Sequence, residues 1–333
     1  VISTRGSAYS TGSGFYLEGA KNVIIERLHF NDCRYGACYS TFGETPADSC
    51  LNISFNHNIE ENCMQGMYVN KISGGEIIGN EFFNNEYYYG FRIIFSSDIL
   101  IANNTIYLES TFNYGYGIYA NDIIRCKFYF NSIYSSHRGL FLGGSASTGI
   151  EIYNNIFYSD YSGLNLDFLP LWVEHSGIAV TDYNCYYGPG CDNMVYWGGV
   201  YYPFLSAYSG VTGNGLHSIN ADPSFVNTTV GNHNLHLSDS SPCKEMGTGL
   251  PEITVDIDGD NRHPTTPCIG ADEIADGLRI ALVPENPPVL IPAAGGYFNF
   301  TVVLENFADQ AVQSDGWIDI IFPTGQSYGP VGL

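Results

Sequence analysis

One pattern recurs between residues 66 and 163 and limits what this chain can fold into. A glycine begins a short run of alternating apolar residues at Gly66, Gly90, Gly117, Gly139 and Gly163. After each of the first four glycines, a second apolar run ends in asparagine and a bulky apolar residue. The glycines lie 24, 27, 22 and 24 residues apart, so both patterns keep step. Such self-similarity is typical of a stacked array in which each unit buries its apolar face against its neighbours.

The contents of the repeat indicate strands rather than helices. The apolar runs alternate over four to eight residues and favour Ile, Val, Phe and Tyr, whereas a helical repeat needs three-and-four spacing over ten or more positions. Stacked coils of this kind pair each short strand in parallel with its copy about 4.8 Å away. The sequence therefore predicts an all-β chain built as a parallel β-helix, a solenoid.

Asparagine recurs at the end of the second run. In stacked coils these residues lie above one another at a turn, where their amides can form a hydrogen-bonded ladder. The alternative is that asparagine is simply common in turns. The predicted ladder contains Asn58, Asn80, Asn104, Asn131 and Asn155.

On these repeats the chain resembles the right-handed parallel β-helix family of bacterial secreted proteins, which includes pectate lyases and polygalacturonases. The resemblance covers about residues 14 to 190. It implies a secreted or cell-surface bacterial protein with the right-handed form of the β-helix. It is specific for fold and not for activity, because this architecture hosts several chemistries and binding roles.

The pattern changes after the repeats, and we expect three regions. Residues 1–210 form the β-helix, residues 211–275 resemble the closing module that follows many bacterial β-helices, and residues 276–333 begin a further domain. A closing module makes physical sense because an open solenoid end exposes unpaired strand edges. In the last region, a proline-rich linker precedes strand-like runs that predict a partial immunoglobulin-like β-sandwich, too short for about seven strands.

Charge and hydropathy exclude several partners. With 12 basic and 34 acidic residues, the formal net charge of −22 repels phosphate backbones, so nucleic acid is not an expected partner. No stretch approaches 18 uninterrupted apolar residues, so no transmembrane segment is expected. No export signal is visible, and we expect it to lie outside this piece of the protein. A monomer is expected.

Nine cysteines are present, so at least one thiol is unpaired by count. No pair has the Cys-x-x-Cys spacing of a zinc knuckle or redox motif. Cys185 and Cys191 flank a turn of sequence Tyr-Tyr-Gly-Pro-Gly and are a candidate disulfide, as are Cys243 and Cys268.

Two columns of side chains are expected to point outward from the first strand of each coil, because residues alternate inward and outward along a strand. Aromatic rings with amides and charged groups at this spacing are a plausible platform for a polysaccharide or cell-surface glycan. The alternative is that outward tyrosines reflect strand propensity and packing between coils. The candidate glycan-binding residues are Tyr16, Tyr68, Asn70, Arg92, Tyr119, Asn121, Phe141, Asn165 and Asp167.

Catalysis is the competing interpretation. Glycoside hydrolysis needs two carboxyl groups about 5 to 9.5 Å apart, but Glu18 and Asp167 of the outward columns are six coils distant, roughly 29 Å. The resemblance to lyases implies instead Ca²⁺ bound by clustered acids and a basic residue that abstracts a proton. The candidate catalytic residues are His137, Arg138 and Arg92.

One acidic stretch is a candidate metal site. Asp256, Asp258 and Asp260 surround Gly259 and have the oxygen density that Ca²⁺ favours. Pro267 stands where an EF-hand loop needs a bidentate Glu, so that motif is excluded, and a plain acidic turn is the alternative. His233 and His236 are three residues apart on an expected strand, hence on opposite faces, and are not expected to be ligands.

The sequence thus predicts a secreted or surface-displayed β-helix that binds polysaccharide or serves as an adhesion structure. The alternative is a polysaccharide lyase or glycoside hydrolase acting along the outward face. No cofactor is implied beyond a candidate Ca²⁺ ion. A structural stalk is a third interpretation, and it predicts that the tyrosine column is covered.

Overall fold

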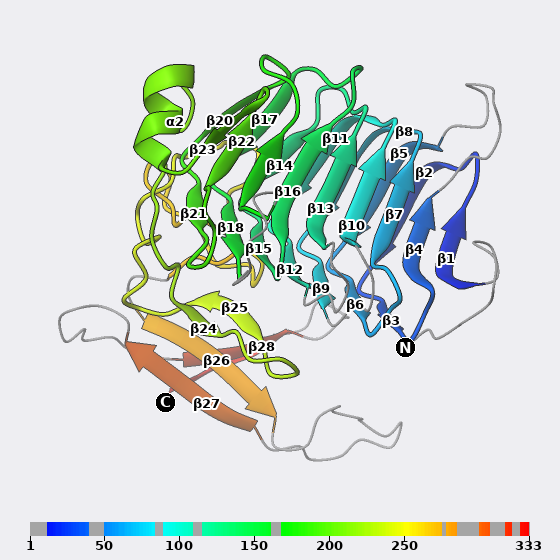
Figure 1. The fold of residues 1–333 in the computed structure, drawn as a ribbon. Coiled ribbons are helices and arrows are strands. Elements are labelled where there is room, and N and C mark those ends of the chain that lie inside the picture. Colours follow the sequence, from blue (N-terminus) through cyan, green and yellow to red (C-terminus); the bar gives the residue numbers. More distant parts are fainter. Residues whose placement is uncertain are drawn as a thin grey trace. The chain divides into compact units, whose positions relative to one another are not determined.

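The computed structural model describes residues 12–39, 50–83, 89–108, 115–160, 168–274, 278–284, 300–306, 317–321 and 327–332. The chain divides into two compact units, residues 1–274 and 275–333. In the first unit the chain winds in coils, and most coils give one strand to each of three sheets (Figure 1). Consecutive strands within these sheets run parallel, apart from the terminal β22–β23 pair. The unit is an all-β solenoid of the parallel β-helix type, as the repeat predicts, and of the right-handed type that the family resemblance implies.

In each of the three sheets, neighbouring strands follow one another in chain order. The first contains β1 (Ser13–Leu17), β4 (Tyr35–Tyr39), β7 (Met67–Asn70), β10 (Tyr89–Ile94), β13 (Tyr116–Asn121), β16 (Arg138–Gly143), β19 (Leu171–Val173), β22 (Val195–Trp197) and β23 (Val200–Tyr202). The second contains β2 (Lys21–Glu26), β5 (Cys50–Asn56), β8 (Ile72–Ile78), β11 (Ser97–Ala102), β14 (Lys127–Tyr129), β17 (Ile150–Tyr153) and β20 (Ala179–Asp182). The third contains β3 (His29–Asn31), β6 (Ile59–Glu61), β9 (Glu81–Phe83), β12 (Thr105–Leu108), β15 (Ser132–Ser135), β18 (Ile156–Ser159) and β21 (Cys185–Tyr187).

The repeated glycine has a steric cause. Tyr89 pairs with Tyr116 and Tyr116 with Arg138, so the glycines that follow these residues lie above one another. A Cβ atom added at Gly90 would lie 2.8 Å from the carbonyl oxygen of Gly117 and 2.6 Å from Cγ2 of Ile106. Neighbouring coils therefore approach too closely for a side chain there, and this explains the period of the glycine in the sequence.

Alternate residues of the first sheet fill the interior. Those of β7, β10, β13 and β16 are at most 2% exposed and form one apolar cluster along the solenoid axis. Burial of each large apolar side chain stabilises the fold by about 1.5 to 3 kcal/mol. The inward set includes Met67, Val69, Phe91, Ile93, Ile118, Ala120, Leu140 and Leu142.

The asparagines form a buried ladder at the turn between the second and third sheets. The side-chain amide of each donates to the side-chain oxygen of the next at 2.9 to 3.1 Å, from Asn58 to Asn155. The ladder continues to Asn184, to which Asn155 donates at 3.1 Å. The residue before each rung has a left-handed φ between 52° and 67°. The turn is thus identical from coil to coil, which keeps the amides in register.

The helix α2 (Leu205–Thr212) follows the last strand of the first sheet, and the antiparallel pair β24 (Phe225–Asn227) and β25 (Asn234–Leu237) comes after it. Residues 214–219 close the last coil, because Ile219 bridges to Cys185 and Ser218 accepts the backbone N–H of Asn184. Residues 248–271 lie along the ladder side of the solenoid, where Asn154 donates to Thr248. Residues 211–274, which we call the closing module, therefore cover both an end and a side of the solenoid.

The second unit contains two antiparallel pairs, β26 (Leu278–Pro284) with β27 (Phe300–Asn306) and β28 (Trp317–Ile321) with β29 (Ser327–Gly332). An immunoglobulin-like sandwich for this region stays a prediction. Within the described residues, no helix is long and apolar enough to span a membrane.

Candidate functional site

The outward side chains of the first sheet form one continuous line, here called the aromatic column. Consecutive strands pair Tyr68 with Arg92, Arg92 with Tyr119 and Tyr119 with Phe141. Phe141 pairs with Trp172, and Trp172 with Tyr196. The candidate residues Asn165 and Asp167 lie outside the described residues. The register shows that Trp172, rather than Asn165, follows Phe141, because the segment before β19 is longer than the average coil.

Ring stacking holds the aromatic column together. Tyr119 and Phe141 stack with centroids 4.8 Å apart, and Trp172 stacks on Tyr196 at 3.9 Å. The guanidinium of Arg92 lies 5.0 Å from the ring centre of Tyr68 and 5.5 Å from that of Tyr119. Such cation–π contacts are favourable by about 0.5 to 2 kcal/mol, depending on desolvation. The packing between coils that the sequence offered as an alternative is therefore real.

The column is less exposed than the alternation pattern predicts, because each ring is covered by its stacked neighbours. Tyr68 is 7% exposed and Phe141 8%, while Tyr16 and Tyr119 are half-buried. Even so, three buried polar atoms on this sheet have no hydrogen-bond partner in the described structure: Asn70 Oδ1, Arg92 Nε and Trp172 Nε1. Asn121, in contrast, donates to Asp122 at 2.6 Å.

The three candidate catalytic residues do not share one environment. Arg138 lies at the edge of the aromatic column, donating to the hydroxyl of Tyr116 at 2.7 Å with its guanidinium over the ring of Trp172. His137 packs edge-on against Phe168, and burial lowers the pKa of its imidazole to about 4. Arg92 is two strands away, about 10 Å at the usual strand spacing. The structure brings the two arginines to one face, whereas His137 is buried beside Phe168.

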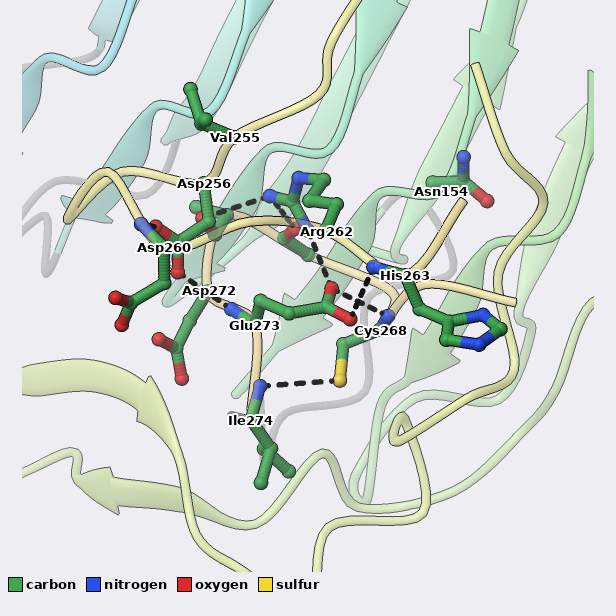
Figure 2. Close-up of polar contacts among 12 residues, drawn as sticks. Asn154, Val255, Asp256, Asp260, Arg262, His263, Cys268, Asp272, Glu273 and Ile274 are labelled. Atoms are coloured by element: carbon green, nitrogen blue, oxygen red, sulfur yellow. Dashed lines mark hydrogen bonds and ion pairs between the residues drawn. The ribbon is translucent and has the colours of Figure 1, made fainter. Parts of the chain in front are cut away.

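A buried polar network anchors the closing module to the solenoid (Figure 2). Arg262 pairs with Glu273 at 3.2 Å and donates to the side-chain oxygen of Asn103, a residue of the ladder turn, at 2.8 Å. Its guanidinium also lies 4.0 Å from the ring centre of Phe130. Burial lowers the pKa of Arg262 and raises that of Glu273. We call this set, with Asp256, the arginine network.

The side chains of the three candidate Ca²⁺ ligands do not converge on one site in this region. Asp256 is buried, and its Oδ1 accepts the backbone N–H groups of Asp258 and Asp260 at 3.0 and 2.8 Å. Its Oδ2 accepts the N–H of Glu273 at 2.9 Å. Asp256 therefore shapes a turn with both oxygens, and only Asp258 of the three contributes to a group of metal-ligand side chains.

That group comprises His236, Asp258 and Asp272, here called the His–Asp cluster. One ligand atom from each lies within 4.8 Å of the other two. His236 Nε2 is 2.9 Å from Asp258 Oδ2, and this contact raises the pKa of the imidazole to about 9. Asp272 is buried and accepts the N–H of Leu237 at 2.7 Å. Burial raises the pKa of Asp272 to about 6.

A cavity of about 430 Å³ lies between the third sheet and β25, and His236 and Asp258 line it. Glu81 of β9 lines the same cavity, and burial raises the pKa of its carboxyl while the charge of His236 opposes that shift. His233 also lines it, stacked on Tyr107 with centroids 4.5 Å apart. In the described structure, Nδ1 of His233 is buried without a hydrogen-bond partner.

The sequence does not reveal this cluster. Its members are 22 and 14 residues apart along the chain, and none of these spacings is a metal-binding motif. The expectation that His233 and His236 face opposite ways fails, since both line one cavity. The strand β25 begins only at Asn234, so the alternation rule does not extend to His233. The one available signal was the acidic stretch that contains Asp258.

Taken together, the fold and these sites define a parallel β-helix protein whose closing module carries potential metal ligands. A family described as "Periplasmic copper-binding protein (NosD)" matches residues 1–167, half of the chain. The chain belongs to this family. The match agrees with the β-helix and does not include the residues of the closing module.

Other comparisons add little. No curated protein matches the chain. Among solved structures, ORF18 of Geobacillus virus E2 is similar at 12% sequence identity and a TM-score of 0.29, with 66% of this chain and 54% of that chain covered. The chain thus spans about half the length of that protein, and a likeness of this size carries no argument.

Proposed function

We propose that this protein is exported and binds a divalent copper ion at the His–Asp cluster. The observation that carries the proposal is the convergence of ligand atoms of His236, Asp258 and Asp272 within 4.8 Å of one another. The description of the family, which names copper and the periplasm, supports both the metal and the compartment.

The donor chemistry fits copper better than calcium. An imidazole nitrogen with carboxylate oxygens suits divalent copper, zinc or nickel, and copper binds most tightly to a given site of this kind. Ca²⁺ takes six to eight oxygen ligands and does not favour imidazole. Asp256, the residue that would begin a calcium loop, has its oxygens on backbone N–H groups. Glu81, which lines the cavity beside His236, is a further candidate ligand.

The test is a binding titration of the full chain with Cu²⁺, Zn²⁺ and Ca²⁺ by calorimetry, with electron paramagnetic resonance of the Cu²⁺ form. We expect one Cu²⁺ per chain, with a spectrum that shows nitrogen coupling from an imidazole. His236→Gln and Asp272→Asn should each weaken Cu²⁺ binding by roughly tenfold or more, because each removes a ligand.

The chain offers a matched control. His217 and Asp182 form another His–Asp pair, with Nδ1 and Oδ2 2.7 Å apart, but no third ligand joins them within the described residues. His217→Gln should leave Cu²⁺ affinity unchanged. Equal loss in His217→Gln and His236→Gln, or no loss in His236→Gln, would contradict the proposal.

Glycan binding along the aromatic column is a second candidate function. The unsatisfied atoms Asn70 Oδ1, Arg92 Nε and Trp172 Nε1 favour it, because buried polar groups without partners are uncommon unless a ligand or water completes them. Stacked rings flanked by such donors and acceptors suit a sugar chain. The lyase or hydrolase alternative would act on the same face.

A polysaccharide array separates these readings if the same samples are scored for retained protein and for new reducing ends or unsaturated products. Retention without products supports binding, whereas products support the enzymatic alternative. Trp172→Ala should abolish retention, and Tyr183→Ala should not, since Tyr183 stacks on His217 away from the column. If the protein is not retained and no products form, the aromatic column is a structural feature.

A further inference from the structure

Two cysteines from different parts of the chain meet in one buried cluster. Cys185 begins β21, the last strand of the third sheet, and Cys243 lies 58 residues later in the closing module. Both are fully buried, and both belong to an apolar cluster with Ile156, Leu237 and a third cysteine, Cys268. The side chain of Cys185 lies beside that of Cys243 in this cluster, and its presence raises the pKa of the Cys243 thiol. The two sulfur atoms are thus neighbours in the folded chain.

The backbone holds both residues in place independently of this contact. Cys185 donates its N–H to Asn155 at 2.9 Å, and its thiol donates to the carbonyl of Ala221 at 3.2 Å. On the other side, Ser241 accepts the N–H of Cys243 at 3.1 Å and donates to Pro223 at 2.6 Å. Segments 221–223 and 241–243 therefore pack against the last coil, and the proximity of the thiols does not depend on one flexible side chain.

Of the two pairs expected from the sequence, Cys243 and Cys268 share this cluster, whereas Cys191 lies outside it. No disulfide joins the described cysteines. Cys191 is half-buried and turns to Ser159, with its sulfur 3.7 Å from the carbonyl oxygen and 3.5 Å from the hydroxyl. The sulfur of Cys268 accepts the N–H of Ile274 at 3.3 Å (Figure 2). Within the cluster, Cys185 rather than Cys268 is the thiol that shifts the pKa of Cys243.

We propose that Cys185 and Cys243 form a disulfide in the exported protein, a staple between the last coil and the closing module. Export is the part of the proposed function on which this inference rests; copper binding is not needed. Disulfides persist in the bacterial periplasm and on cell surfaces, whereas the cytosol keeps thiols reduced. Neighbouring buried thiols in such a compartment are suited to oxidation once they can be reached.

The reaction is thiol–disulfide exchange with a protein disulfide oxidant. The thiolate of one cysteine attacks the disulfide of the oxidant and releases one of its thiolates. The thiolate of the other cysteine then attacks this protein's own sulfur in the mixed disulfide and releases the second. The two thiols lose two protons and two electrons, and the disulfide of the oxidant becomes a dithiol.

Burial sets the order of events. In the folded chain the neighbouring Cys185 thiol and burial hold the pKa of Cys243 above its usual range, so little thiolate is present, and the oxidant cannot reach either sulfur. The bond therefore forms while the closing module is still undocked. Protein that folds in reduced form should oxidise slowly afterwards, and the oxidised form should resist mild reductants.

The experiment maps disulfides in the full chain secreted into an oxidising compartment. The protein is alkylated under denaturing conditions without reductant, digested and analysed by mass spectrometry. We expect a linked pair of peptides that contain Cys185 and Cys243, about 2 Da lighter than the sum of the two reduced peptides. Reduction should lower the Tm by roughly 10 °C, since a loop of this length gives a typical disulfide effect.

Matched variants sharpen the assignment. Cys243→Ser should leave Cys185 alkylated and should lower the Tm as reduction does. Cys268→Ser and Cys191→Ser should leave the linked peptide intact. If Cys243→Ser does not fold, the wild-type peptide map still decides.

Three results would overturn the proposal. The first is alkylation of both Cys185 and Cys243 in secreted protein. The second is a linked peptide that joins Cys185 to Cys191 or Cys243 to Cys268. The third is a copper(I) ion that a cuprous chelator removes and that protects the two thiols from alkylation. None of these depends on the His–Asp cluster, whose variants test copper binding separately.

Discussion

The asparagine ladder and the arginine network both bury polar side chains, but they satisfy them in different ways. In the ladder, each amide donates to the next asparagine and to a backbone carbonyl, and each side-chain oxygen accepts from the coil before it. In the network, Arg262 contacts Glu273, Asn103 and two carbonyls, and no other part of the described chain repeats that set. The ladder is periodic and uncharged, whereas the network occurs once and is charged.

This difference predicts different costs when one member is removed. Loss of a ladder rung orphans a few neutral groups, and the rungs on either side keep their other bonds. Loss of one partner from a buried ion pair leaves an uncompensated charge, which is the more expensive defect. The following predictions test that ordering.

The largest effect is expected for Arg262→Met. The change leaves Glu273 buried without its cation and removes the donor to Asn103. We expect the free energy of unfolding to fall by about 3 to 5 kcal/mol, measured by urea denaturation. The double variant Arg262→Met, Glu273→Gln should lose less than the sum of the two single variants, because the buried charge is gone. A loss below about 1 kcal/mol in the single variant would show that the network is not rigidly buried.

Next comes Asn131→Ala in the middle of the ladder. It orphans the carbonyl of Ile101 and the N–H of Asn104, which Asn131 contacts at 2.9 and 3.1 Å. With about 1 to 3 kcal/mol for each unsatisfied group, we expect a loss of about 3 to 4 kcal/mol. Asn227→Ala is the control, since Asn227 also accepts a backbone N–H, that of Thr229, but is only half-buried and makes this hydrogen bond at the surface. Equal losses in the two variants would contradict the role of burial.

The sequence predicts the periodic parts of the structure better than the contacts that occur only once. The period of the glycines and asparagines predicts the solenoid, its inward residues and five rungs of the ladder, because each signal is repeated several times. The sixth rung, Asn184, comes after an irregular coil and is missing from the predicted ladder. The same irregularity conceals the place of Trp172 in the aromatic column.

The closing module has no such redundancy. The His–Asp cluster joins residues 236, 258 and 272, and its cavity adds Glu81 from the solenoid. These contacts depend on how the module docks along the ladder turn, which local pattern does not encode. The same holds for Cys185 and Cys243, whose proximity is a product of docking rather than of a tight turn. The spacing of cysteines along the chain favoured Cys185 with Cys191 and Cys243 with Cys268, because spacing reports only sequence separation.

A third prediction concerns His137, a buried group that also occurs once but lies within the solenoid. Burial depresses the pKa of its imidazole to about 4, below the usual value of 6.5. Its contribution to stability is therefore fully present above pH 6.5 and is lost as the pH falls toward 4. The loss should be at most about 3 kcal/mol, and His137→Phe should flatten the pH dependence of unfolding in that window. The same slope in wild type and His137→Phe would be contrary to this assignment; exposed His175→Gln is the control.

The smallest effect is expected for Lys127→Met, which tests whether burial is the reason for the cost of Arg262→Met. Lys127 and Glu252 also join the solenoid to the closing module, at 2.9 Å, but their side chains are 36% and 41% exposed. Water solvates either charge after the partner is lost, so we expect a loss below about 0.5 kcal/mol, smaller still in high salt. Methionine keeps most of the aliphatic stem of Lys127 and removes the ammonium, which lies 5.6 Å from the ring centre of Tyr129. If urea denaturation gave Lys127→Met the same loss as Arg262→Met, bridging the two parts of the chain, and not desolvation of the charge, would determine the cost.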